Sequence, residues 1–148
     1  MGRTIKFYAL PILCALLVGV AQAKAEEDAN WTVVTMARGG AWGAFTSPSL
    51  AEAIAASIRA CKTMSTGEND CGAEFRAIRR GWTLAFLCGD HRILATGYSL
   101  QEAEAAIRFR TELKRAYVRD MPPCKQVLAV SPAGVIIENR AQETNNTE

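Results

Sequence analysis

Apolar residues recur at helical spacing in two parts of this 148-residue chain. Leu50 and Ile54 begin one such stripe, which predicts a helix over 49–63. Leu100 begins a second stripe, which predicts a helix over 99–118. Both stripes are narrow and rich in alanine, as expected of helices that pack closely on one side of a sheet.

The remaining pattern is typical of strands separated by turns. Ala73, Phe75 and Ala77 alternate with Glu74 and Arg76, as in a strand with one buried face. An opening strand followed by two βαββ units predicts an α+β fold, a mostly antiparallel sheet with two helices packed on one face. The predicted strands span 31–37, 41–46, 73–77, 82–88, 92–96, 124–131 and 135–137.

One segment of the chain occurs twice. Six of eight positions are identical between 49–56 and 99–106. Each copy begins with serine and has glutamate three residues later, a capping box in which the serine oxygen accepts from the glutamate amide and the glutamate reaches back. We therefore predict an internal duplication, with halves at about 41–90 and 91–138.

The first 25 residues have the pattern of a cleavable secretory signal peptide. Arg3 and Lys6 precede an uncharged apolar run at 7–20, and small residues allow cleavage after Ala23 or Ala25. The run is shorter than the roughly 20 residues that a membrane-spanning helix needs. We therefore expect a periplasmic or secreted protein. The predicted divisions are the signal peptide at 1–25, a single domain at 26–138 and a flexible tail at 139–148.

Removal of the signal changes the charge. The whole chain carries a net charge of +2, but cleavage after Ala25 removes three basic residues and leaves 14 basic against 15 acidic ones. Such a protein lacks the broad positive field that holds a phosphate backbone, so we expect no nucleic-acid partner. We also expect no membrane span after cleavage, because no later segment is long and apolar enough.

The cysteines indicate two disulfides. Cys14 leaves with the signal, and the even number that remains in an exported chain favours disulfide pairing of Cys61, Cys71, Cys88 and Cys124. Three pairings are possible from the sequence. The duplication favours a bond between Cys61, at the end of the first helix, and Cys71, at the start of the next strand. Cys88 would then pair with Cys124.

Cys88 also lies three residues from His91, the single histidine of the chain. The two could form the nucleophile pair of a small hydrolase, or half of a metal site. Against this, a tight turn points neighbouring side chains apart, and the chain has no Cys-x-x-Cys pair to build a zinc site. We therefore expect no catalytic residue, no metal and no cofactor, with Cys88 and His91 as the catalytic alternative.

Three further residues are candidates for binding. Trp42 lies among glycines and could be a platform for carbohydrate or protein, although a core ring packed over glycines fits the pattern better. Arg108 and Arg115 belong to a basic group on the second helix that an acidic partner could use. Glutamates interleaved with this group favour a solvated helix face instead.

The sequence resembles a family of small exported bacterial proteins, the domain-of-unknown-function 4189 type. The resemblance rests on the string from Ala41 to Ala44, a helix of the form Ser-Leu-x-Glu-Ala that ends at Cys61, the loop to Cys71, and a second alanine-rich helix. It covers 31–137. Thr111 stands near the place where the family has a further cysteine. Membership would imply a bacterial envelope or secreted module, without specifying an activity.

Together these features predict an exported, disulfide-stabilised and non-catalytic bacterial protein that binds or inhibits an envelope or extracellular protein. Nearly every polar residue has a structural explanation, which leaves none over to form a catalytic site. One alternative is a small secreted hydrolase that uses Cys88 and His91. Another is a wall-glycan-binding module that uses Trp42.

Overall fold

The computed structural model describes residues 30–65 and 70–138. The predicted signal peptide at 1–25 and the predicted tail at 139–148 lie outside these ranges. Within the described ranges, no helix has both the length and the apolar character needed to cross a membrane.

The helices and strands follow the predicted order, and the α+β class is confirmed. Their bounds differ from the predicted ones by a few residues. Helix α1 spans Leu50–Met64 and helix α2 spans Leu100–Tyr117. The strands are β1 (Trp31–Met36), β2 (Trp42–Ser47), β3 (Phe75–Arg79), β4 (Trp82–Cys88), β5 (His91–Gly97), β6 (Lys125–Val130) and β7 (Ile136–Glu138).

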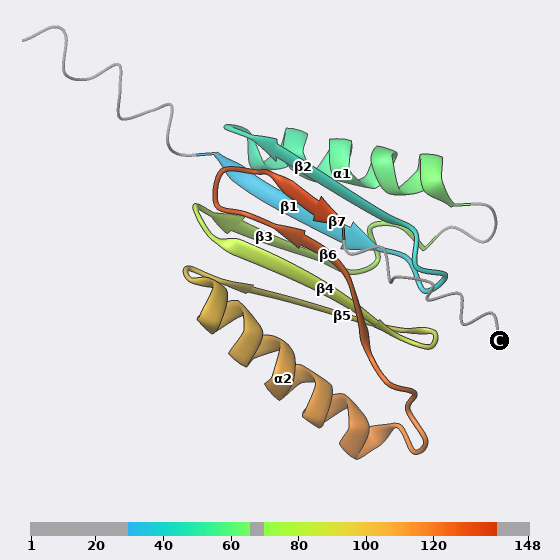
Figure 1. Cartoon of the computed structure of the whole chain (residues 1–148). Coiled ribbons are helices and arrows are strands. Elements are labelled where there is room, and N and C mark those ends of the chain that lie inside the picture. The colour runs from blue at the N-terminus through green and yellow to red at the C-terminus, as the bar shows by residue number, and fades with distance from the viewer. Residues whose placement is uncertain (1–29, 66–69, 139–148) are drawn as a thin grey trace, which may run out of the picture.

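The strands pair antiparallel, as predicted, but they form two sheets where a single sheet was expected. One sheet has the order β2-β1-β3 and the other the order β5-β4-β6-β7. Helix α1 packs on β1 and β2, whereas α2 packs on β4 and β5. Figure 1 shows the two helices on opposite sides of the pair of sheets, so they do not share one face. The layers are therefore helix, sheet, sheet, helix.

An apolar core joins the two sheets and explains why there are two. Val34 and Met36 of β1 pack with Ala85, Leu94 and Leu128 of the other sheet, and all five side chains are fully buried. A second buried cluster joins β4 and β5 to α2. Strands β1 and β4 are thus covered on both faces, which accounts for their nearly continuous apolar sequence. One sheet with helices on a single face would leave half of these residues exposed.

Strand β3 starts two residues later than predicted, and its one buried side chain belongs to the face that was predicted to point outward. Ile78 is buried, whereas Phe75 is 39% exposed. The chain turns before β3 at Gly72, where φ is +90°. The Thr35 hydroxyl accepts from the Gly72 amide at 2.9 Å and donates to the Glu74 carbonyl at 2.8 Å. These bonds satisfy backbone groups that would otherwise need a strand partner, so the ladder begins later.

The same strand order recurs in the two sheets. In β2-β1-β3 and in β5-β4-β6, the central strand comes first in the chain, its hairpin partner second, and the strand after the helix third. Both central strands begin with the dipeptide Trp-Thr, at Trp31 and Trp82. The sheets therefore group the elements as two ββαβ units, with β7 added at an edge. The internal duplication itself stays a prediction.

Both helices begin at the predicted serine caps. Ser49 Oγ accepts from the amide of Glu52 at 3.3 Å, and Ser99 Oγ accepts from the amide of Glu102 at 3.1 Å. The glutamate side chains reach farther back than a capping box predicts: the Glu52 carboxylate accepts from the Ser47 hydroxyl at 2.7 Å, and the Glu102 carboxylate accepts from the Tyr98 amide at 2.8 Å. Each glutamate therefore ties the strand end that precedes the helix to the first turn.

Candidate functional site

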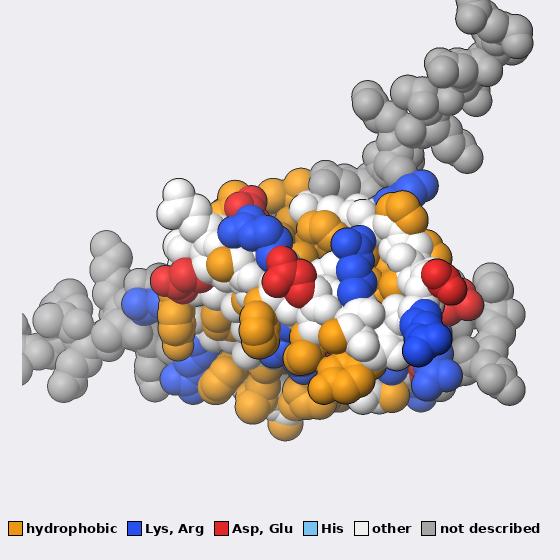
Figure 2. Space-filling view, turned by 90° about the horizontal axis from the view of Figure 1, so that it is seen from below, with side chains coloured by type: hydrophobic (Ala, Val, Ile, Leu, Met, Phe, Trp, Pro, Cys, Tyr) orange, Lys and Arg blue, Asp and Glu red, His pale blue; other side chains and the backbone are white. Residues whose placement is uncertain are grey.

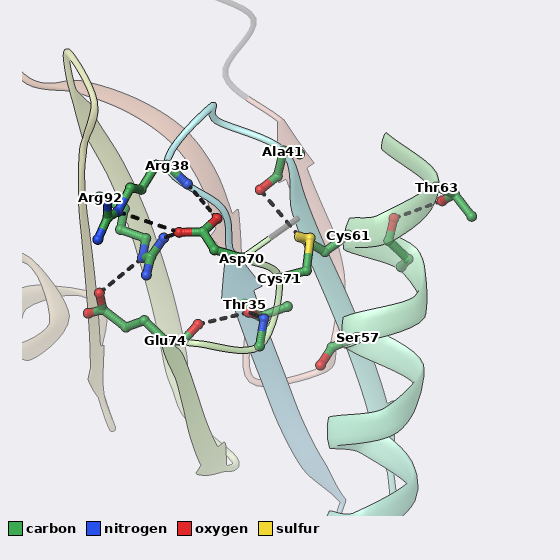
Figure 3. The surroundings of a disulfide bond; sticks show 12 residues. Thr35, Arg38, Ala41, Ser57, Cys61, Thr63, Asp70, Cys71, Glu74 and Arg92 are labelled. Carbon is green, nitrogen blue, oxygen red and sulfur yellow. Dashed lines mark hydrogen bonds and ion pairs between the residues drawn. A yellow bond between two sulfur atoms is a disulfide. The ribbon is translucent and has the colours of Figure 1, made fainter. Parts of the chain in front are cut away.

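The disulfides have the pairing that the duplication favoured. Cys61 in the last turn of α1 is bonded to Cys71, and Cys88 at the end of β4 is bonded to Cys124, just before β6. Figure 3 shows the first of these bonds between α1 and the segment that leads into β3. Because disulfides persist in oxidising compartments, the two bonds indicate an exported or extracellular protein.

Cys88 and His91 lie opposite each other across the turn between β4 and β5. The Cys88 sulfur is bonded to Cys124, and its side chain is fully buried in the cluster beneath α2. A closed disulfide provides neither a nucleophilic thiolate nor a thiolate ligand. His91 instead lines an open depression together with Asp90 and Arg92.

Trp42 is half-buried at the start of β2. Its ring packs against the cluster that contains Val34 and Met36, where Leu87 of the other sheet also packs. This placement favours the core interpretation of Trp42 over an exposed platform.

The second half of α2 is largely uncovered. Ala103 and Ile107, both in the first half, are the buried residues of this helix. Beyond them Phe109, Leu113 and Tyr117, spaced four residues apart, are 67%, 49% and 81% exposed. Figure 2 views the molecule from the α2 side and shows hydrophobic side chains gathered there, with Lys and Arg among them. We call Phe109, Leu113 and Tyr117 the α2 stripe; contiguous exposed apolar surface of this kind marks interaction sites.

Two basic residues, Arg110 and Lys114, lie on the same side of α2 as the residues that pack against the sheet. Ala103, Ile107, Arg110 and Lys114 follow one another at intervals of three or four residues, so they lie along one side of the helix. The first two are buried against the sheet, and the last two line a groove of about 240 Å³ between α2 and β5. Arg92, Ile93 and Leu94 line the β5 side of this groove, and Leu113 and Tyr117 line its helix side with the cations.

A network of ion pairs links the two sheets beside this groove, as the sticks in Figure 3 show. Arg92 of β5 donates from Nε to Glu74 at 3.2 Å and pairs through a terminal nitrogen with Asp70. Arg38 also pairs with Asp70, at 3.6 Å, and Arg76 pairs with Glu74, at 3.7 Å. The hydrogen bond from Arg92 is the main cause that holds the pKa of Asp70 below its ordinary value, and burial acts in the opposite direction.

Arg108 and Arg115, the basic candidates from the sequence, are exposed on α2. They are seven residues apart and therefore share one side of the helix, about a third of a turn from the line of Ile107 and Lys114. The structure thus separates them from the groove.

Arg92 and Glu74 were absent from the sequence candidates, whereas Arg110 and Lys114 belong to the basic group on the second helix that the sequence offered to an acidic partner. Arg92 and Glu74 are 18 residues apart and come from different sheets, so no helical or strand period connects them. The place of Arg110 and Lys114 beside the sheet also had a signal in the sequence. They occupy positions at which the helical stripe through Ala103 and Ile107 calls for apolar residues.

Comparison with known proteins finds no family model, no curated protein and no solved structure that matches this chain. The resemblance to the domain-of-unknown-function 4189 type therefore stays a prediction.

Proposed function

We propose that this chain is an exported, non-catalytic bacterial protein that binds or inhibits another envelope or extracellular protein through the α2 stripe. The observation that carries the proposal is the exposure of Phe109 and Tyr117, 67% and 81%, on a well-formed helix. Aromatic side chains and arginines are enriched at the energetic centres of protein interfaces. The stripe supplies the aromatic component, with Arg110 beside it.

The anchoring of α2 also supports a binding role. Ala103 and Ile107 hold its first half on the sheet, and the bond between Cys88 and Cys124 fastens the segment that follows the helix to β4. A surface held in this way needs little ordering when a partner binds, so more of the interaction energy remains as affinity.

The two alternatives from the sequence have less support. A hydrolase built on Cys88 and His91 needs a thiolate, and the bond to Cys124 removes it. A glycan-binding module built on Trp42 needs an open ring face, whereas Trp42 packs against the core between the sheets.

Capture from a bacterial envelope extract tests the proposal. The mature chain, with both disulfides formed, is immobilised, and a retained protein is identified by mass spectrometry, purified and titrated against the chain. The double variant Phe109→Ser/Tyr117→Ser is expected to weaken this binding by at least about a hundredfold, because each aromatic ring that is buried contributes roughly 1.5–3 kcal/mol.

Tyr98→Ser is the matched control. Tyr98 is 76% exposed but precedes α2, outside the stripe. Its replacement is expected to change the affinity less than about twofold. A partner that binds both variants as well as the wild type, or an envelope extract from which no protein is retained, would contradict the proposal.

A further inference from the structure

The groove between α2 and β5 carries more positive charge than its neighbours neutralise. Neither Arg110 nor Lys114 has an ion-pair partner among residues 30–65 and 70–138. The carboxylate that lines the groove, Glu74, is already shared by Arg92 and Arg76. Two cations therefore lie on the side of α2 that faces the sheet without a matching anion.

The positive charge of Arg110 also acts on Arg76, which pairs with Glu74. Burial is the main cause that lowers the pKa of Arg76, the charge of Arg110 lowers it further, and Glu74 acts in the opposite direction. The Arg76 Nε is buried and has no hydrogen-bond partner within the part of the chain that the structure describes. An anion in the groove would reduce the repulsion between Arg110 and Arg76.

The groove also has an apolar part. Leu113 and Tyr117 line its helix side and are 49% and 81% exposed. Its volume of about 240 Å³ is below the roughly 300–1,000 Å³ of pockets that enclose a whole small-molecule ligand. Size and lining suit one or two side chains of a larger molecule, with a charged group and an apolar group side by side.

We propose that this groove binds an acidic segment of the protein partner. Carboxylate oxygens of the segment accept from Arg110 and Lys114, and a neighbouring apolar side chain packs on Leu113 and Tyr117. This inference rests on the proposed function and adds the chemistry by which the partner is recognised.

Charge distinguishes this occupant from a second copy of the chain. Between residues 108 and 119 the sequence has five basic residues and a single acidic one, Glu112. Two copies that met through α2 would bring like charges together, which disfavours the contact.

Shape distinguishes it from an anionic membrane surface. Past Lys114 the groove continues into a depression that Glu74 and Asp90 also line. A flat anionic surface would meet these carboxylates together with the cations, whereas the carboxylates of a narrow segment can lie at Arg110 and Lys114, while Glu74 stays paired with Arg92 and Arg76.

Selection of random peptides tests the inference without the natural partner. A phage-displayed library of random dodecapeptides is selected on the immobilised mature chain with both disulfides formed. We expect enrichment of peptides that carry Asp or Glu next to an apolar residue. The dissociation constants of the selected peptides, made synthetically, are then measured by fluorescence anisotropy.

The variant Arg110→Gln/Lys114→Gln is expected to weaken the binding of these peptides by at least about tenfold, because two close charge pairs are lost together. The control Arg108→Gln/Arg115→Gln removes the same charge from another side of α2 and should change binding less than about threefold. Exchange of Asp and Glu for Asn and Gln in the peptides should weaken binding to the wild type as strongly as the groove variant does.

Several results would overturn the inference. These are enrichment of neutral or basic peptides, equal effects of the two charge variants, and retention by phosphatidylglycerol vesicles that the groove variant abolishes while peptides stay unbound. A natural partner that is lost with Phe109→Ser/Tyr117→Ser but binds Arg110→Gln/Lys114→Gln normally would leave the proposed function intact and refute the acidic segment alone.

Discussion

Arg92 of β5 donates a hydrogen bond from Nε to a carboxylate oxygen of Glu74, at 3.2 Å, and so ties the two sheets together outside the apolar core. The same side chain pairs with Asp70, and thus holds both carboxylates of the segment that leads into β3. A guanidinium presents several donors in one plane and can bind two carboxylates at once, which the ammonium group of lysine does less well.

Replacement of Arg92 should therefore destabilise the fold. The Arg92 side chain is 11% exposed, and its loss leaves two partly buried carboxylates without their main partner. We expect Arg92→Ala to lower the free energy of unfolding by about 2–3 kcal/mol, and Arg92→Lys to restore less than half of the loss. Urea denaturation with the disulfides intact measures both. Arg108→Ala, at an exposed site, should stay within about 0.5 kcal/mol of the wild type, and a similarly small effect of Arg92→Ala would show that the network adds nothing.

Acid should remove the contribution of Asp70. The hydrogen bond from Arg92 is the largest cause of its lowered pKa. A carboxyl whose pKa is lower in the folded chain stabilises the fold fully above its unfolded pKa of about 3.9, and this stabilisation is lost as the pH falls through the folded pKa. Asp70→Asn should thus be less stable than the wild type near neutral pH, and the difference should shrink between about pH 5 and pH 2.

Urea denaturation at several pH values within this range measures that difference. A gap between wild type and Asp70→Asn that stays constant into acid would mean that the carboxylate charge of Asp70 does not stabilise the fold.

The two disulfides should contribute unequally. The bond between Cys88 and Cys124 closes a sequence separation of 36 residues, and the bond between Cys61 and Cys71 a separation of 10. Closure of a longer loop removes more entropy from the unfolded chain. Removal of the bond between Cys88 and Cys124 should therefore lower the free energy of unfolding by about 1 kcal/mol more than removal of the bond between Cys61 and Cys71. The double variants Cys88→Ala/Cys124→Ala and Cys61→Ala/Cys71→Ala are compared by thermal and urea unfolding, and the reverse order would refute the estimate.

Gly43 should be intolerant of a side chain. A Cβ atom there would collide with the Ser57 carbonyl oxygen and lie 2.5 Å from the backbone nitrogen of Cys61, because α1 packs directly on this point of β2. Gly43→Ala is therefore expected to cost about 2–3 kcal/mol through displacement of the helix. Gly39→Ala is the control, since a Cβ atom at Gly39 meets nothing within 4 Å. Equal stability of the two variants would contradict the close packing of α1.

Much of the local structure followed from the sequence because short-range rules determine it. Apolar periodicity located both helices, and serine caps located their first turns at Ser49 and Ser99. Strand β3 was the exception. Its predicted inward residue Phe75 is exposed, and Ile78 on the opposite face is buried; the contacts of Thr35 with Gly72 and Glu74 also delay the start of the ladder. Such contacts, across more than 35 residues of chain, leave no trace in local alternation.

The sequence by itself determined the order of the elements and, through the repeated helix start, the favoured pairing of Cys61 with Cys71 and of Cys88 with Cys124. Its mark of export, the pattern of the first 25 residues, is likewise local. These properties depend on neighbouring residues, or on a count of cysteines, and so can be obtained without coordinates.

The tertiary structure alone decided that the strands divide into two sheets, that Arg92 bridges them to Glu74, and that Arg110 and Lys114 face a groove. The physical reason is common to all three. Each depends on which faces of elements that are distant in the sequence pack together. This packing follows from the burial of both faces of β1 and β4, which involves strands and helices from the whole described fold.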